Sequence, residues 1–86
     1  MNREELEKLR NRIDELDDAL ALLLERRQEI ARAIGEAKNG VHIYDPVREN
    51  EVVRGIQSRH PGISPRSLAV IMREVISLCR SIQSLP

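Results

Sequence analysis

Residues 6–34 read LEKLRNRIDELDDALALLLERRQEIARAI, and the fold class can be inferred from their pattern. Its apolar side chains recur at alternating spacings of three and four residues, the heptad pattern of a long helix with one apolar stripe. The stripe consists of Leu6, Leu9, Ile13, Leu16, Leu20, Leu23, Ile30 and Ile34. No proline occurs in residues 3–38, and Asn39-Gly40 is a typical helix stop, so we expect one helix of roughly 36 residues, about 54 Å long. In a chain of 86 residues, such a helix must protrude or run beside a partner chain.

Two shorter helices are expected to follow. Asp45-Pro46 has the pattern of an N-cap followed by proline at the first helical position, and this second, short helix should end near Arg59. Ser64-Pro65 repeats the signal and begins a third helix of medium length. Its apolar stripe consists of Leu68, Ile71, Met72, Val75, Ile76, Cys79 and Ile82. The sequence therefore predicts an all-α fold with three helices per chain, in a single domain over residues 1–86.

Charge and hydropathy exclude several classes of protein. The chain has 14 basic and 14 acidic residues and a formal net charge of zero, whereas binders of nucleic acid or anionic membranes usually carry a basic surplus. No apolar run approaches the roughly 18 residues of a membrane span. The polar start of the chain does not resemble a signal peptide. We therefore expect a cytoplasmic protein that binds neither nucleic acid nor membrane.

The residue types also limit the core and the chemistry. With one Tyr, no Trp and no Phe, three helices would enclose a thin core, so we expect oligomerisation. Cys79 is the only cysteine, which excludes an internal disulfide, and His42 and His60 are isolated. The sequence has no Gly-rich phosphate loop and no Ser-His-Asp arrangement. We expect neither a metal nor a cofactor.

Two cations lie on one face of the first helix. Arg27 interrupts the heptad stripe, and Lys38 follows 11 residues later. At 100° per residue this spacing puts both on the same face, about 16 Å apart along the axis. Together they could hold a small dianion. Taken singly, Arg27 could instead extend to solvent or pair with a carboxylate, and Lys38 could complement the helix dipole.

The other helices supply further candidates. Glu49 lies three, four and seven residues before apolar positions of the second helix, so it should face inward with them. Asp45 and Arg48 flank it, although Asp45 could be a plain N-cap and Arg48 part of a solvated first turn. Cys79 and Gln83 are four residues apart and point the same way. The simpler alternatives are a small core side chain for Cys79 and a frayed terminus for Gln83.

Arg10 raises a geometric problem. It precedes Arg27 by 17 residues, which is about 25 Å along the helix and about 100° around it. One small ligand cannot contact both side chains within one chain. If both serve one site, Arg10 must come from an antiparallel partner helix, which ties function to dimerisation.

Five segments together resemble the all-helical chorismate mutases. They are residues 9–17 (LRNRIDELD), 22–27 (LLLERR), 34–38 (IGEAK), 44–49 (YDPVRE) and 79–83 (CRSIQ). The chain also resembles the N-terminal mutase domain of bifunctional chorismate mutase–prephenate dehydratases. Its residues 72–80 (MREVISLCR) are similar to the end of that domain. The resemblance implies an intertwined homodimer of three-helix chains, and a dehydratase domain could follow beyond Pro86.

The resemblance also implies a role for each candidate. Arg27 and Arg10 of the partner subunit would bind the two carboxylates of chorismate. Lys38 and Gln83 would contact the ether oxygen of the breaking bond, and Glu49 the ring hydroxyl. Asp45 and Arg48 would line the same wall. Cys79 stands where the family commonly has serine, and a thiol is a weak donor.

The implied reaction is the Claisen rearrangement of chorismate to prephenate, in the biosynthesis of phenylalanine and tyrosine. It needs orientation and electrostatic stabilisation but no covalent intermediate, metal or cofactor. Two alternatives stay open. An isochorismate pyruvate-lyase would share the fold and a similar cationic site. A non-catalytic dimeric coiled-coil module would explain the heptads but leave Arg27 unexplained.

Overall fold

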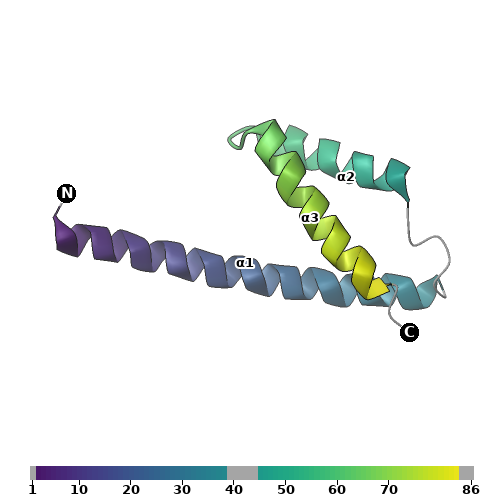
Figure 1. The fold of residues 1–86 in the computed structure, drawn as a ribbon, viewed down its shortest axis with the longest axis horizontal. Coiled ribbons are helices and arrows are strands. Elements are labelled where there is room, and N and C mark those ends of the chain that lie inside the picture. Colours follow the sequence, from purple (N-terminus) through teal and green to yellow (C-terminus); the bar gives the residue numbers. More distant parts are fainter. Residues whose placement is uncertain (1, 39–44, 84–86) are drawn as a thin grey trace.

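The computed structural model describes residues 2–38 and 45–83, with side chains through Ser81, and this part of the chain is entirely helical apart from its turns (Figure 1). Helix α1 comprises Arg3–Ala37, α2 comprises Pro46–Arg59 and α3 comprises Pro65–Gln83. The all-α prediction, the order of lengths, the beginnings of the three helices and the end of the second helix at Arg59 are confirmed. The expected stop at Asn39-Gly40 and the connection over residues 41–44 lie outside the described residues.

Local hydrogen bonds explain where the helices begin. The Asp45 side chain accepts a hydrogen bond of 3.0 Å from the backbone amide of Arg48, and the Ser64 hydroxyl accepts one of 3.4 Å from that of Ser67. Helix α1 begins with a capping box that the sequence analysis missed. Glu5 donates its backbone amide to Asn2 Oδ1 at 2.8 Å, and the Asn2 amide donates to the Glu5 carboxylate at 3.4 Å. These caps satisfy amides that have no partner within their helix.

Helix α3 holds the fold together. It packs against the C-terminal part of α1 on one side and against α2 on the other. The buried apolar side chains come from all three helices: Ala31, Val53, Leu68, Ile76 and Cys79. Ile71, which shares the predicted α3 stripe, stays exposed in this chain. The core is as thin as the lack of aromatics predicts, and it lies at one end of the molecule.

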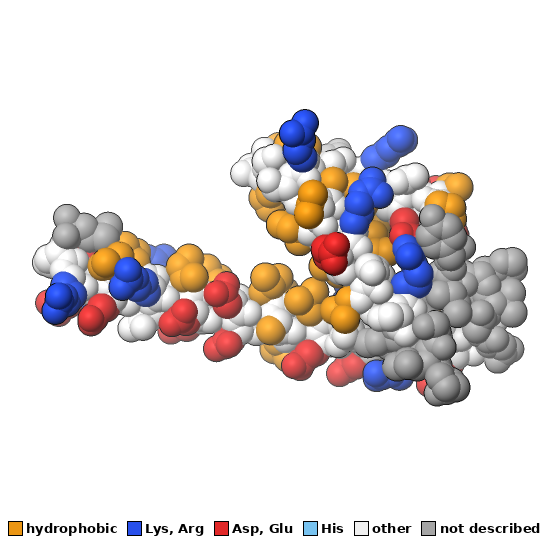
Figure 2. All heavy atoms as spheres, viewed as in Figure 1, with side chains coloured by type: hydrophobic (Ala, Val, Ile, Leu, Met, Phe, Trp, Pro, Cys, Tyr) orange, Lys and Arg blue, Asp and Glu red, His pale blue; other side chains and the backbone are white. Residues whose placement is uncertain are grey.

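The N-terminal part of α1 extends away from this core. The chain measures 55 × 27 × 15 Å, and α1 runs along the longest dimension (Figure 1). Apolar side chains gather along one edge of the extended part and acidic side chains along the opposite edge (Figure 2). Leu16, in the middle of the predicted stripe, is 65% exposed. A single chain therefore leaves the stripe over residues 6–23 uncovered.

Among the described residues, no helix is both long and apolar enough to cross a membrane.

Candidate active site

A cavity of about 540 Å³ lies where the three helices come together. This size is typical of sites for small molecules. Its apolar lining consists of Ile30, Ala31, Ile34, Val52, Ile76 and Cys79. Its charged lining consists of Arg27, Lys38, Asp45, Arg48, Glu49 and Arg80. The cavity thus combines an apolar surface with several charged groups that can fix the orientation of a ligand.

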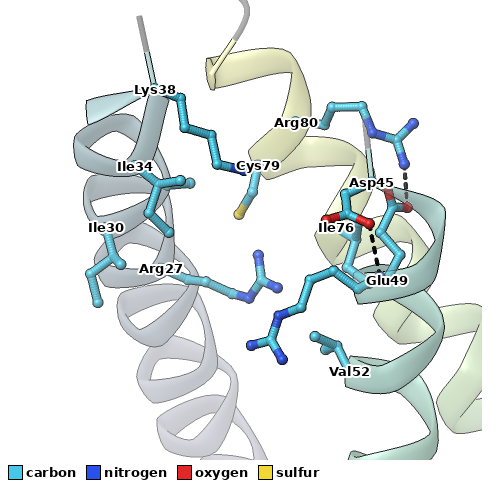
Figure 3. Close-up of a pocket in the computed structure, with 12 residues that line it drawn as sticks. Arg27, Ile30, Ile34, Lys38, Asp45, Glu49, Val52, Ile76, Cys79 and Arg80 are labelled. Atoms are coloured by element: carbon cyan, nitrogen blue, oxygen red, sulfur yellow. Dashed lines mark hydrogen bonds and ion pairs between the residues drawn. The ribbon is translucent and has the colours of Figure 1, made fainter. Parts of the chain in front are cut away.

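Helix α1 contributes the two cations that the sequence predicted. Arg27 and Lys38 both line the cavity and extend from α1 toward α3, where Cys79 lies (Figure 3). Arg27 is half-buried. Their spacing of three helical turns therefore puts both side chains on one wall, as predicted.

Helix α2 contributes the acidic groups and one further cation. Glu49 faces inward as predicted, and its side chain is 23% exposed. Asp45 lines the cavity and also caps α2, so the simpler alternative for this residue is correct without excluding a role in the site. Arg48 lines the cavity as well, but its side chain is 70% exposed and lies 3.9 Å from the carboxylate of Glu51.

Helix α3 contributes a residue that the sequence analysis missed. Arg80 lines the cavity, and its guanidinium group donates a hydrogen bond to Glu49 Oε1 across the α2–α3 interface (Figure 3). Arg80 follows the buried Ile76 by four residues, so helical spacing puts both on the same face. This spacing could have indicated from the sequence that Arg80 faces inward. However, a basic residue in the last turn of a helix is also explained by its favourable interaction with the helix dipole, so Arg80 did not stand out.

Cys79, Gln83 and Arg10 differ from the other predicted site residues in their placement. Cys79 is buried, with 4% of its surface exposed, and it both belongs to the core and lines the cavity. The backbone of Gln83 ends α3, but its side chain lies outside the described residues. Arg10 is exposed on the extended part of α1 and does not line the cavity of its own chain. Apart from Arg10 and Gln83, all the predicted site residues therefore line one cavity of the single chain.

The charges suit an anionic ligand. Four of the described lining side chains are basic and two are acidic, which leaves a formal charge of two positive units. Among the described residues, no group of three or more His, Cys, Asp and Glu side chains is placed to hold a metal ion. What the geometry offers is binding, orientation and electrostatic stabilisation in a partly apolar cavity.

These features describe an all-helical domain with a cavity whose described lining carries a surplus of positive charge. The chain matches the family described as chorismate mutase type II over residues 9–84, and it belongs to that family. This confirms the resemblance found in the sequence.

Curated relatives agree with the family match. A bifunctional chorismate mutase/prephenate dehydratase of Neisseria gonorrhoeae is 41% identical over 75 residues, covering 86% of this chain and 21% of the relative. A bifunctional chorismate mutase/prephenate dehydratase of Aquifex aeolicus is 37% identical over 87 residues, covering 93% of this chain and 24% of the relative. The T-protein of Enterobacter agglomerans is 36% identical over 76 residues, covering 84% of this chain and 20% of the relative. The chain thus spans between a fifth and a quarter of the length of these relatives. No solved structure gives a significant match.

Proposed function

We propose that this domain is a chorismate mutase, which converts chorismate to prephenate by an intramolecular Claisen rearrangement. The observation that carries the proposal is the meeting of Arg27, Lys38 and Glu49 around one cavity in a member of the chorismate mutase type II family. Chorismate is a dianion with an apolar ring. The charge of the lining and its apolar surface are complementary to both features.

Binding of the two carboxylates would set the conformation of the substrate. Arg27 would hold one carboxylate, and Arg10 of the partner subunit would hold the other. Holding both ends selects the compact form in which the two reacting carbons are close, which lowers the barrier by orientation. Asp45 and Arg48 would complete the wall, and Cys79 would contact the substrate as a small side chain and a weak donor.

Stabilisation of the developing charge would accelerate the bond breaking. Negative charge grows on the ether oxygen as the carbon–oxygen bond lengthens. Lys38, and Gln83 at the end of α3, would donate hydrogen bonds to that oxygen, and Glu49 would accept one from the ring hydroxyl. Donors that are already in place need no reorganisation during the reaction. This chemistry requires no metal, cofactor or proton transfer.

The proposal includes an intertwined homodimer. The stripe over residues 6–23 is apolar and uncovered in one chain, and Leu16 and Leu20 are both more than half exposed. An antiparallel copy would cover the stripe and bring Arg10 of the partner subunit to the cavity. The whole protein is also proposed to act in the cytoplasm in aromatic amino acid biosynthesis, with a fused prephenate dehydratase as in the relatives.

The direct test is to add the purified domain to chorismate. We expect loss of the chorismate absorbance and formation of prephenate. Isochorismate, tested in parallel, should release no pyruvate. Pyruvate release from isochorismate without turnover of chorismate would favour the lyase instead. No turnover of either compound by a folded dimer would favour the coiled-coil module.

A further inference from the structure

Arg80 joins two walls of the cavity. It extends from α3 and contacts the Glu49 carboxylate of α2, on the side of the cavity away from Arg27 and Lys38 of α1 (Figure 3). The residues are 31 positions apart in the sequence, so this contact depends on the packing of α2 against α3. The roles assigned so far leave Arg80 without a function.

The surroundings of this ion pair differ from those of an ordinary surface pair. The side chains of Arg80 and Glu49 are 35% and 23% exposed, whereas those of Arg48 and Glu51 are 70% and 63% exposed and lie 3.9 Å apart. Pairs as exposed as Arg48–Glu51 contribute little to stability because water screens them. The partly buried pair is screened less, so Arg80 can determine where the Glu49 carboxylate lies.

The Glu49 carboxylate needs a partner that fixes its position, because the cavity contains several cationic side chains. Arg27 and Lys38 line the opposite wall and would attract a carboxylate that was free to rotate. The contact with Arg80 uses Oε1 of Glu49, and within the described residues Oε2 accepts no hydrogen bond. A carboxylate can accept several hydrogen bonds, so Oε2 can receive one from a ligand while Oε1 is held.

We propose that Arg80 is a positioning residue for the substrate hydroxyl. It holds Glu49 against the α2–α3 wall with Oε2 directed to the ring hydroxyl, and it keeps this carboxylate away from Arg27 and Lys38. Because Arg80 offsets the charge of Glu49, the remaining described lining carries two positive units toward a dianion. This inference rests on the proposed function and adds a specificity determinant for the hydroxyl.

The test compares two substrates in a set of variants. Arg80→Met removes the charge at similar length, Arg80→Lys keeps the charge, and Arg73→Met makes the same change at an exposed α3 position outside the cavity. Each variant is assayed with chorismate and with an analogue that lacks the ring hydroxyl. Arg80→Met is also combined with Glu49→Gln, and the thermal unfolding of every protein is recorded.

We expect Arg80→Met to raise KM for chorismate about tenfold with little change in kcat, the effect of weakening one hydrogen bond to a charged group. For the analogue, KM should match that of the unsubstituted enzyme. Arg80→Lys should restore part of the affinity, and Arg73→Met should change neither constant. In the Glu49→Gln background, Arg80→Met should add no further loss.

Several results would overturn the assignment. Equal losses for both substrates would mean that Arg80 binds a carboxylate or only stabilises the fold. Losses that add independently to those of Glu49→Gln would exclude action through Glu49. If Arg80→Met does not fold, a partial loss in Arg80→Lys that is the same for both substrates decides against the proposal. An unsubstituted enzyme without chorismate turnover would instead refute the proposed function and the inference together.

Discussion

The two parts of α1 share one heptad pattern but have different surroundings. Over residues 6–23 the stripe is uninterrupted and exposed, and Leu16 shows 65% of its surface. Beyond Arg27 the same helix packs against α3, and Ala31 and Gly35, each one position after a stripe residue, are buried there. The stripe residues themselves, Ile30 and Ile34, line the cavity and stay exposed. The break at Arg27 coincides with the beginning of the cavity. One helix thus serves two interfaces: residues beside the stripe are buried within the chain, whereas the exposed stripe over residues 6–23 needs a cover that we assign to a second copy.

A charge placed in the exposed part of the stripe should have the largest effect. If the chain worked alone, Leu16→Glu would change stability by about 0.5 kcal/mol or less, as at most surface positions. If a partner covers Leu16, the change removes about 2 kcal/mol of apolar burial per chain and buries a charge. We expect dissociation at micromolar concentration and at least a hundredfold loss of activity.

Sedimentation and chorismate turnover together check this prediction. Glu15→Ala, one residue away on the polar side of the helix, is the control and should leave both unchanged. A compact, folded monomer of 9.9 kDa from the unsubstituted chain would contradict the dimer.

The second prediction concerns the cations on the two parts of α1. Arg10→Ala and Arg27→Ala should each lower kcat/KM about 100-fold or more, because each removes a charge-assisted contact with a substrate carboxylate worth about 3 kcal/mol. Both variants should remain folded dimers. The prediction fails if Arg10→Ala, whose side chain is remote from its own cavity, keeps full activity.

The third prediction concerns Gln83 at the end of α3. A neutral amide donates a hydrogen bond at any ordinary pH, whereas a carboxyl group donates only when protonated. Gln83→Glu should therefore keep activity in acid and lose it as the pH rises and the introduced group ionises. The unsubstituted enzyme should have a nearly flat profile, because no proton moves. Gln83→Ala should be slower at every pH.

Profiles of kcat/KM between about pH 4 and pH 9 decide this prediction, because the ordinary pKa of a glutamate carboxyl group, about 4.3, lies within this range. Equal activity of Gln83→Glu at both ends of the range would remove Gln83 from the reacting centre.

The smallest effect is expected at Cys79. A serine hydroxyl has nearly the volume of the thiol and is a better donor. Burial of a hydroxyl without a partner would cost about 1–3 kcal/mol. We expect Cys79→Ser to change kcat/KM less than about threefold, with an equal or lower KM, because the hydroxyl would find the substrate as its partner. A large rise in KM with unchanged unfolding would mean that Cys79 packs against apolar atoms only.

Local signals explain what could be predicted from the sequence. The caps at Asp45 and Ser64 predict where α2 and α3 begin. The helical period places Arg27, Lys38 and Glu49 on inward faces. The Arg80–Glu49 contact could not be predicted in this way. It depends on how α2 and α3 pack, which the period of either helix alone does not determine. For the same reason, the period of α1 alone does not determine which surface of a second chain would cover the stripe.

Mixing the Arg10→Ala and Arg27→Ala proteins tests directly whether two chains share each site. In a mixed dimer, one site combines an intact Arg27 with an intact Arg10 of the partner subunit, and the other site lacks both. After complete subunit exchange, half of the dimers are mixed and each has one intact site, so about a quarter of the unsubstituted activity should return. If subunit exchange is verified and no activity returns, Arg10 does not complete the partner's site, and the account is contradicted.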